Sequence, residues 1–242
     1  MKRIINILQV VVLLLIPLSA GAQIGEHRSD LAIGVNGGYA LSSIGFTPKV
    51  TQGMHGGMTG GLSVRYVCEK YFKTICSIYA ELNYTSAGWK ENIVDLNNQP
   101  VKGKSGADEQ YSRTLSYVQL PIMAHLAWGK EHRGLQFFVQ AGPQFGYMLS
   151  ESTTANFEPA DANLDDRANK EITQYGMKVE NKFDYGIAAG AGLELSTSVG
   201  HFLLEGRYYY GLGNIYGSSK RDYFSKSNNG IILIKASYLI DI

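Results

Sequence analysis

The sequence predicts an all-β fold: an eight-stranded antiparallel up-and-down transmembrane β-barrel with short periplasmic turns and long extracellular loops. Three observations support this prediction. Apolar and polar residues alternate along eight segments, the links between these segments alternate in length, and the polar faces carry many small residues. Because side chains on a strand point alternately to its two faces, each segment indicates a strand with one apolar and one polar face.

The segment from 134 to 152 shows the alternation clearly. Leu135, Phe137 and Val139 fall on odd positions, while Gln136 and Gln140 fall on even ones. In a soluble β-protein the apolar face forms the core, whereas in a membrane barrel it contacts lipid and the polar face lines the lumen. The pattern therefore predicts a strand and leaves open which face points inward.

Eight segments follow this pattern, an even number as in bacterial membrane barrels. In chain order, the expected strands cover residues 31–39, 57–67, 75–84, 116–128, 134–152, 185–195, 202–210 and 231–240. Their apolar faces carry, in the same order, Leu31, Ile33, Val35 and Tyr39; Leu62, Val64 and Tyr66; Ile78, Ala80, Leu82 and Tyr84; Val118, Leu120, Ile122 and Leu126; Leu135, Phe137, Val139 and Phe145; Tyr185, Ile187, Leu193 and Leu195; Phe202, Leu204, Tyr208 and Tyr210; and Ile232, Ile234, Tyr238 and Ile240.

The links between the strands alternate in length. The first, third, fifth and seventh links are long, and the second, fourth and sixth are short; in order they cover residues 41–56, 68–74, 85–113, 129–134, 149–183, 196–200 and 211–230. In an up-and-down barrel this alternation places all short turns at one end and all four long loops at the other, as in outer-membrane barrels.

Two features favour an apolar face that points outward. Small residues such as Gly186, Ala188 and Gly190 lie on the polar faces, where a narrow barrel interior would need them. Aromatic residues such as Tyr39 and Tyr147 lie toward the ends of the apolar faces, where membrane barrels carry their interfacial girdles. The alternative fold is a soluble sandwich or a lipocalin-type barrel.

The N-terminus has the three parts of a secretory signal peptide. Lys2 and Arg3 precede an apolar run over residues 4–18, and an Ala-x-Ala site ends at Ala22. We expect residues 1–22 to be a cleaved signal peptide for the Sec pathway and residues 23–242 to form one barrel domain. An exported chain without a second apolar helix can span a membrane only as a closed barrel, which predicts the outer membrane of a Gram-negative bacterium. The net charge of +1 favours no nucleic-acid partner.

The strands also resemble a known family, the PorT-like or outer membrane protein beta-barrel domain family of small Gram-negative barrels. The resemblance runs through "GVNGGYALSSI" (34–44), "GGMTGGLSVRY" (56–66), "AELNYTSAGW" (80–89), "SYVQLPIMAHLAWG" (116–129), "FFVQAGPQFGYMLS" (137–150), "DYGIAAGAGLEL" (184–195) and "EGRYYYGLGNI" (205–215). It implies an outer-membrane barrel, often described as porin-like, and no catalytic residues. The sequence departs from many such barrels at its C-terminus, which ends "YLIDI" rather than in an aromatic residue.

Seven titratable residues lie on the predicted polar faces: Arg65, Glu81, His125, Glu194, Glu205, Arg207 and Lys235. Charges inside an eight-stranded barrel must pair, because the interior is only wide enough for side chains and an unpaired buried charge is costly. The favoured interpretation is a packed, salt-bridged lumen; the alternative is an ion path or proton relay. His125 is expected to be structural, since no nucleophile and acid are spaced to form a catalytic triad with it.

Cys68 and Cys76 flank the second link, and in an oxidising compartment they form either a disulfide or two free lipid-facing thiols. The segment "DANLDDRANKE" (161–171) imitates the start of a calcium loop, but Asp166 stands where that loop needs glycine and Ile172 where it needs glutamate. We therefore expect a mobile polar loop, and no metal or cofactor.

The favoured function is structural or interactive: a barrel with a side-chain-filled lumen that presents four surface loops. A narrow porin-like channel for ions or small solutes is the first alternative, and a barrel-embedded lipid-modifying enzyme is the second, ranked last; we expect no enzyme. The expected partners are outer-membrane lipid, the barrel-assembly machinery and an extracellular or periplasmic protein, with the barrel itself a monomer.

Overall fold

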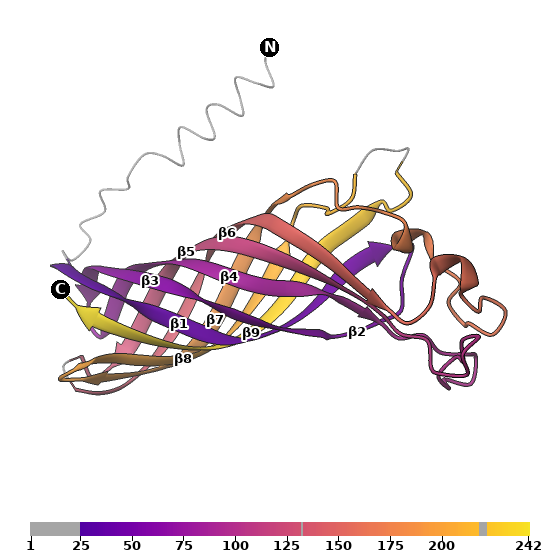
Figure 1. Cartoon of the computed structure of the whole chain (residues 1–242). Coiled ribbons are helices and arrows are strands. Elements are labelled where there is room, and N and C mark those ends of the chain that lie inside the picture. The colour runs from indigo at the N-terminus through magenta and orange to yellow at the C-terminus, as the bar shows by residue number, and fades with distance from the viewer. Residues whose placement is uncertain (1–24, 132, 218–221) are drawn as a thin grey trace, which may run out of the picture.

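The computed structural model describes residues 25–131, 133–217 and 222–242 and consists of one β-barrel with a cluster of loops at one end (Figure 1). The predicted signal peptide, residues 1–22, lies outside the described residues. The strands are β1 (Glu26–Thr47), β2 (Gln52–Gly53), β3 (His55–Tyr71), β4 (Thr74–Glu91), β5 (Tyr111–Gly129), β6 (Gly134–Ala155), β7 (Phe183–Thr197), β8 (Gly200–Gly211) and β9 (Lys226–Asp241).

Eight of these strands form a closed antiparallel ring in the order β1-β3-β4-β5-β6-β7-β8-β9. The ring closes between β1 and β9, whose register runs from Ala32 opposite Asp241 to Thr47 opposite Lys226. The two-residue strand β2 is an addition to β4 outside this ring. Closure leaves none of the eight strands with an unpaired edge, which confirms the predicted fold class.

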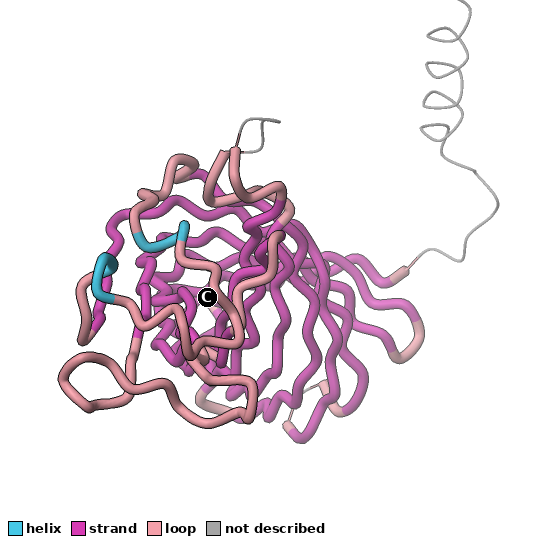
Figure 2. The backbone as a smooth tube through the Cα atoms, turned by 90° about the vertical axis from the view of Figure 1, so that its right-hand side faces the viewer, coloured by secondary structure: helices cyan, strands magenta, loops and turns pink. Residues whose placement is uncertain are grey.

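The two ends of the barrel differ as the link lengths predicted. The turns β3–β4, β5–β6 and β7–β8 and the C-terminus lie at one end, which we call the turn end (Figure 1). The long links, with the 3₁₀ helices η1 (Pro159–Asp161) and η2 (Thr173–Tyr175), lie at the other, the loop end. Seen along the barrel from the loop end, these links fold across its opening (Figure 2).

The apolar faces point outward. Ile33, Leu82, Ile122 and Ile187 are between 40% and 56% exposed, although each lies in the middle of a strand. A soluble barrel would bury such residues, so this surface is built to contact lipid. Predicted polar-face residues such as Gln140 are buried in the lumen, which confirms the inverted orientation.

Aromatic residues form two girdles on the outer surface. By strand register, Tyr66, Trp128, Phe137, Phe202 and Tyr238 lie toward the turn end, and Tyr39, Tyr84, Tyr147, Tyr185 and Tyr210 lie toward the loop end. Aromatic side chains at both membrane interfaces are typical of outer-membrane barrels. The apolar band between the girdles is the surface that spans the bilayer.

Every expected strand is present, and each extends beyond its predicted bounds. Residues 85–91 of β4 and 111–113 of β5, for example, were expected to lie in a loop. Beyond the loop-end girdle the outward positions carry residues such as Ser86 and Ser112, so the apolar alternation that marks a membrane-facing strand is lost although the hydrogen-bond ladder continues. Among the described residues, no helix is long and apolar enough to cross a membrane.

Candidate functional site in the barrel lumen

The middle of the lumen is crossed by a cluster of four charged side chains. Arg207 donates to Glu81 at 2.7 Å and 3.1 Å and to Glu205 at 2.7 Å, and Lys235 donates to Glu81 at 2.7 Å. All four side chains are at most 3% exposed. Glu81 lies on β4 and Arg207 on β8, which are opposite strands of the eight-membered ring, so this pair bridges the full width of the barrel.

Two further bridges cross the lumen between opposite strands. Toward the turn end, Arg65 on β3 donates through Nη1 to both oxygens of Glu194 on β7, at 2.7 Å each. Toward the loop end, Asn229 on β9 donates to the Tyr117 hydroxyl on β5 at 3.2 Å. The lumen is therefore closed at three depths by side chains that meet from opposite walls.

Gln140 connects the two charged clusters. Its amide nitrogen donates to Glu205, and its amide oxygen lies 3.3 Å from Nδ1 of His125. Because the oxygen can only accept, His125 carries a proton on Nδ1. That Nε2 is buried without a hydrogen bond and lies 3.9 Å from the Glu194 carboxylate. The His125 ring stacks on Phe138 at 4.6 Å, which fixes its plane.

His201, at the start of β8, joins the Arg65–Glu194 pair. Its Nδ1 lies 2.7 Å from Glu194, and its Nε2 lies 3.0 Å from the Asp241 carboxylate. Carboxylates at these distances accept hydrogen bonds, so both ring nitrogens carry protons and the ring is cationic. The Ser196 hydroxyl is also 3.1 Å from Nδ1, but that nitrogen has no lone pair left to act as a base.

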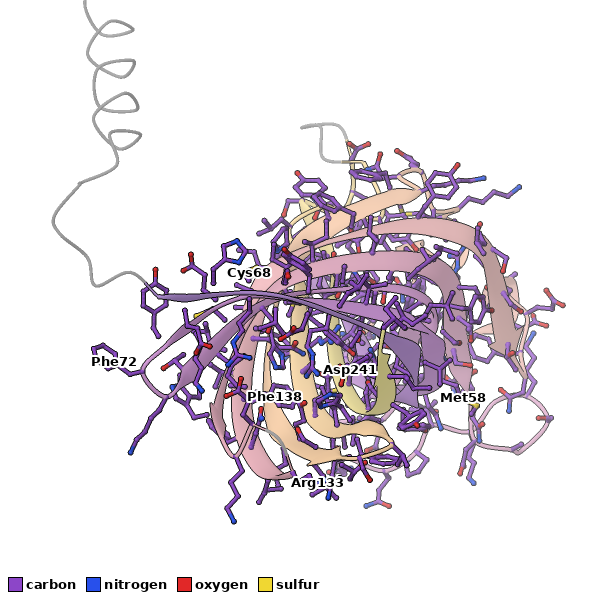
Figure 3. All side chains as sticks on the ribbon, turned by 90° about the vertical axis from the view of Figure 1, so that its left-hand side faces the viewer. Met58, Cys68, Phe72, Arg133, Phe138 and Asp241 are labelled. Atoms are coloured by element: carbon purple, nitrogen blue, oxygen red, sulfur yellow. The ribbon has the colours of Figure 1, made fainter. Side chains whose placement is uncertain are left out.

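A cavity of about 360 Å³ opens between these residues at the turn end. Its inner wall includes Arg65, His125 and Glu194, and its outer part includes Arg28 and Asp241. Figure 3 views the barrel from this end, with Asp241 on the last strand. Since the Glu81–Arg207 bridge crosses the lumen beyond the inner wall, the cavity is blind.

The loop end contains a second, apolar core. Phe46, Trp89, Tyr216 and Phe224 are at most 7% exposed and pack ring to ring, with Phe46 and Trp89 edge to face at 5.3 Å and Phe46 and Phe224 at 4.9 Å. These residues come from the ends of β1 and β4 and from the link between β8 and β9. The links at this end are therefore packed over the barrel opening and close it.

Ion pairs stabilise the loop end, and one of them is buried between two links. Arg167, in the link between β6 and β7, donates to Glu109, in the link between β4 and β5, at 2.7 Å and 3.0 Å, and both side chains are at most 2% exposed. Arg113 on β5 donates to Glu151 on β6 at 2.6 Å. The first pair holds two of the four long loops together, whereas the second joins the neighbouring strands β5 and β6, with the Glu151 side chain 26% exposed.

The segment 161–171, expected to be a mobile polar loop, is anchored through Arg167. At its end, burial acts to raise the pKa of Glu171, but hydrogen bonds from the Tyr223 hydroxyl at 2.6 Å and the Thr173 amide at 3.0 Å outweigh it, so the pKa lies below its ordinary value. Glu171 is thus ionised near neutral pH and accepts a bond from the link between β8 and β9. In the described part of the chain, no group of three or more His, Cys, Asp or Glu residues is placed to hold a metal ion.

Cys68 and Cys76 are both free and partly exposed. Cys68 lies where the β3–β4 register shifts between Val67 and Glu69, and Glu69 is the residue that pairs with Cys76. The bulge offsets the two cysteines across the ladder by one position, and their oxidation to a disulfide stays a prediction.

All seven polar-face residues chosen from the sequence point into the lumen. Six of them form the two charged clusters, and the seventh, His125, links the clusters together with Gln140. Sequence reasoning missed His201, which lies one residue before the expected strand. It also missed the Arg167–Glu109 pair, because loops carry no periodicity that would mark a buried position. Gln140 could have been predicted as a lumen residue, because its even position places it on the polar face of β6.

These features together define a class of protein. A closed antiparallel barrel with an apolar outer band, two aromatic girdles and a filled polar lumen is an integral membrane barrel of the outer-membrane type. The chain belongs to the outer membrane protein beta-barrel domain family, whose model matches residues 21–217.

Comparison with solved structures gives similarities at low identity. Neisserial surface protein A is 11% identical with a TM-score of 0.41, covering 88% of this chain and 97% of that one. OprG from Pseudomonas aeruginosa is 13% identical with a TM-score of 0.38, covering 90% and 95%. Ail, the attachment invasion locus protein of Yersinia pestis, is 12% identical with a TM-score of 0.36, covering 88% and 100%. No curated protein matches the chain.

Proposed function

We propose that this protein is a non-conducting outer-membrane barrel with a structural or interaction role, and that it acts through its four long links. The observation that carries the proposal is the set of bridges between opposite walls, above all Arg207 with Glu81. An eight-stranded barrel has an interior just wide enough for side chains, and here charged side chains at most 3% exposed span it. The packed loop end adds a second closure.

In this proposal the loop end faces the cell exterior and the turn end faces the periplasm, as in barrels with short periplasmic turns. The predicted signal peptide supports export by the Sec pathway, and the sequence motifs support a place in the PorT-like group. The proposed partners are outer-membrane lipid around the apolar band, the assembly machinery during insertion, and a protein at the exposed links. The barrel itself would be a monomer.

The proposal excludes a hydrolytic role for the residues at the turn end. Ser196, His201 and Asp241 have the residue types of a catalytic triad and are hydrogen-bonded in a chain. A catalytic histidine must hold a lone pair toward the nucleophile, whereas both nitrogens of His201 face carboxylates. Ser196 is moreover only 4% exposed.

Conductance in planar bilayers tests the proposal. We expect the purified full-length barrel to insert without stable current steps. The matched experiment uses Glu81→Ala/Arg207→Ala, which removes both ends of one bridge and avoids an unpaired charge. If this variant conducts and the wild type does not, the bridge is the closure. Reproducible open steps from the wild-type barrel would contradict the proposal and support the porin-like channel.

A further inference from the structure

A groove of about 370 Å³ lies at the loop end, between the last part of β1 and the link that contains β2. Residues 43–46 of β1 form one wall, and Lys49, Val50 and residues 52–54 form the other. The volume falls in the range of small-molecule sites, and no carboxylate lines the groove.

The two walls are held together by Gln52. Its side-chain nitrogen donates to the carbonyl oxygen of Ile44 at 2.8 Å, and its side-chain oxygen accepts from the amide of Ile44 at 3.1 Å. The side chain thus takes the place of a strand residue opposite β1. Gly53 keeps the groove open, because a Cβ added there would meet nothing within 4 Å.

The β1 wall belongs to the outer surface of the barrel. Ser43 and Gly45 lie on odd positions of β1, as does the girdle residue Tyr39, and these positions point outward. Ser43 is four residues beyond Tyr39, which places it about 10 Å further along the barrel axis at about 3.3 Å per residue and a tilt of about 40°. The groove therefore begins at the outer limit of the lipid head groups, which extend roughly 5–8 Å beyond the hydrocarbon.

Three exposed lysines surround the groove. Lys49 lines it, Cε of Lys226 lies 3.6 Å from the Cβ position of Gly45, and Lys90 is the register partner of Gly53 between β4 and β2. In the described part of the chain, none of these lysines forms a salt bridge. The rim of the groove therefore carries positive charge that no carboxylate neutralises.

One of these amines reaches down to the girdle. Nζ of Lys226 lies 5.7 Å from the ring centroid of Tyr210, so its aliphatic stem runs along the outer wall and its charge lies at the membrane interface. Lysine binds phosphate as a compact point charge, and anionic lipid head groups attract lysine at this depth.

An apolar surface leads from the groove to the membrane. Met54, at the edge of the groove, and Met58, further along β3, are 54% and 73% exposed. Met58 pairs with Tyr39 in the β1–β3 register, so this surface is continuous with the apolar band. An occupant with a negative head group and acyl chains would contact both the lysines and the methionines.

We propose that the groove binds the phosphate head group of an acylated lipid in the leaflet at the loop end. Lys49, Lys90 and Lys226 neutralise the phosphate, and the acyl chains descend along Met58 and Tyr39. This inference makes specific the lipid partner named above. It rests on the proposed function only for which leaflet supplies the lipid, and conductance of the barrel has no bearing on it.

Native mass spectrometry of the full-length barrel, released from detergent micelles, tests the proposal with lipids of equal chain length. The probes are dioleoyl phosphatidic acid, dioleoyl phosphatidylcholine, which has a zwitterionic head group, and dioleoylglycerol, which lacks the phosphate. We expect one phosphatidic acid to bind at least tenfold more tightly than either of the others. Equal retention of the three lipids would show non-specific contact with the apolar band and overturn the proposal.

Inorganic phosphate distinguishes a lipid site from an anion site. Because it lacks acyl chains, an equal concentration of inorganic phosphate should not displace phosphatidic acid from the barrel. Displacement at equal concentration would mean that the groove binds the free anion and would overturn the assignment to a lipid.

Charge variants test the role of the lysines. Lys49→Gln/Lys226→Gln should weaken binding of phosphatidic acid at least tenfold. Lys102→Gln/Lys104→Gln, in the link between β4 and β5, removes the same charge from another part of the loop end and should leave binding unchanged. Equal weakening by the two double variants would indicate a response to net charge and contradict a site at the groove.

A groove-filling variant tests the position of the lipid while all three lysines are kept. Gly53→Phe should weaken binding of phosphatidic acid at least tenfold, because the ring occupies the open space of the groove. Gly176→Phe is the matched control, since a Cβ at Gly176 also meets nothing within 4 Å and this glycine lies outside the groove. Undiminished binding by Gly53→Phe would place the lipid elsewhere and overturn the proposal.

Discussion

At the scale of single residues, the lumen is organised by the cost of burying charge. Each charged side chain in the middle of the barrel contacts opposite charge: Arg207 lies between Glu81 and Glu205, and Lys235 donates to Glu81. Removing one member of such a buried pair leaves the other uncompensated, and this costs more than the pair contributes to stability.

This logic predicts unequal effects for two glutamates. Glu205→Ala should lower the free energy of unfolding by about 3–5 kcal/mol, because it leaves Arg207 and Gln140 short of an acceptor. Glu158→Ala, in an exposed link, should have little effect. Urea unfolding in lipid measures both, and similar small losses for the two variants would indicate a hydrated lumen.

Glycines test the narrowness of the interior. A Cβ added at Gly190 would lie 2.7 Å from the carbonyl oxygen of Gly206 and 3.1 Å from Cα of Arg207. At Gly206, whose outward side is open, a Cβ meets nothing within 4 Å. We expect Gly190→Ala to lower the melting temperature, Gly190→Trp to abolish assembly, and Gly206→Ala to be silent. Normal yield and melting of Gly190→Trp would contradict the packed lumen.

At the scale of strands and loops, the sequence predicts the structure best where contact with lipid requires apolar residues. All eight barrel strands could be identified, because an outward position between the girdles must be apolar. Beyond the girdles neither face is under that constraint, so the extensions of β4 and β5 have no such pattern. The seven lumen residues were predictable as a set because they occupy the polar faces.

The partners of those residues were not predictable. Arg65 and Glu194 are 129 positions apart in the chain, and Arg207 and Glu81 are 126 apart. Their contact depends on strand tilt and register around the whole ring, which a single sequence does not specify. The same holds for His201 with Asp241, and for Arg167 with Glu109 between two loops.

The apolar band predicts that the free-energy cost of placing a charged side chain on the outer surface depends on its position along the strand. Ile122 lies on β5 between the two girdles and points outward, so Ile122→Arg should destabilise the barrel by about 2–4 kcal/mol. Ser152→Arg, on β6 beyond the girdle residue Tyr147, is the control and should be tolerated. Folding into vesicles in urea measures both; equal tolerance would mean that the bilayer lies elsewhere.

The packing of the loops predicts that loss of one loop contact loosens the loop and leaves the barrel folded. Arg167→Ala should leave Glu109 buried without its partner and loosen the link between β6 and β7, while the membrane-embedded strands stay folded. Limited proteolysis should then cut within residues 156–182 faster than in the wild type, with unchanged barrel melting. Lys170→Ala is the exposed control, and equal cleavage of wild type and Arg167→Ala would refute the anchoring role.

At the scale of the whole molecule, the two unlike ends predict a topology. In a background with Cys68→Ser and Cys76→Ser, single cysteines at Asn98 and Asn169 should react on intact cells with an impermeant maleimide. A cysteine at Lys130, beside the β5–β6 turn, should react only after the outer membrane is opened. Labelling of 130 on intact cells together with silence at 169 would reverse the orientation.

The seam between β1 and β9 has a consequence for how the chain is made. These are the first and last strands of the ring, so closure joins the part of the barrel that is synthesised first to the part that is synthesised last. Until Lys226–Asp241 arrives, β1 and β8 each keep an edge of unpaired peptide groups that hydrocarbon cannot satisfy. A prematurely ended chain is therefore not a smaller barrel but an unsealed sheet. The barrel is therefore sealed at one place, the seam between β1 and β9, and only when the last strand has paired.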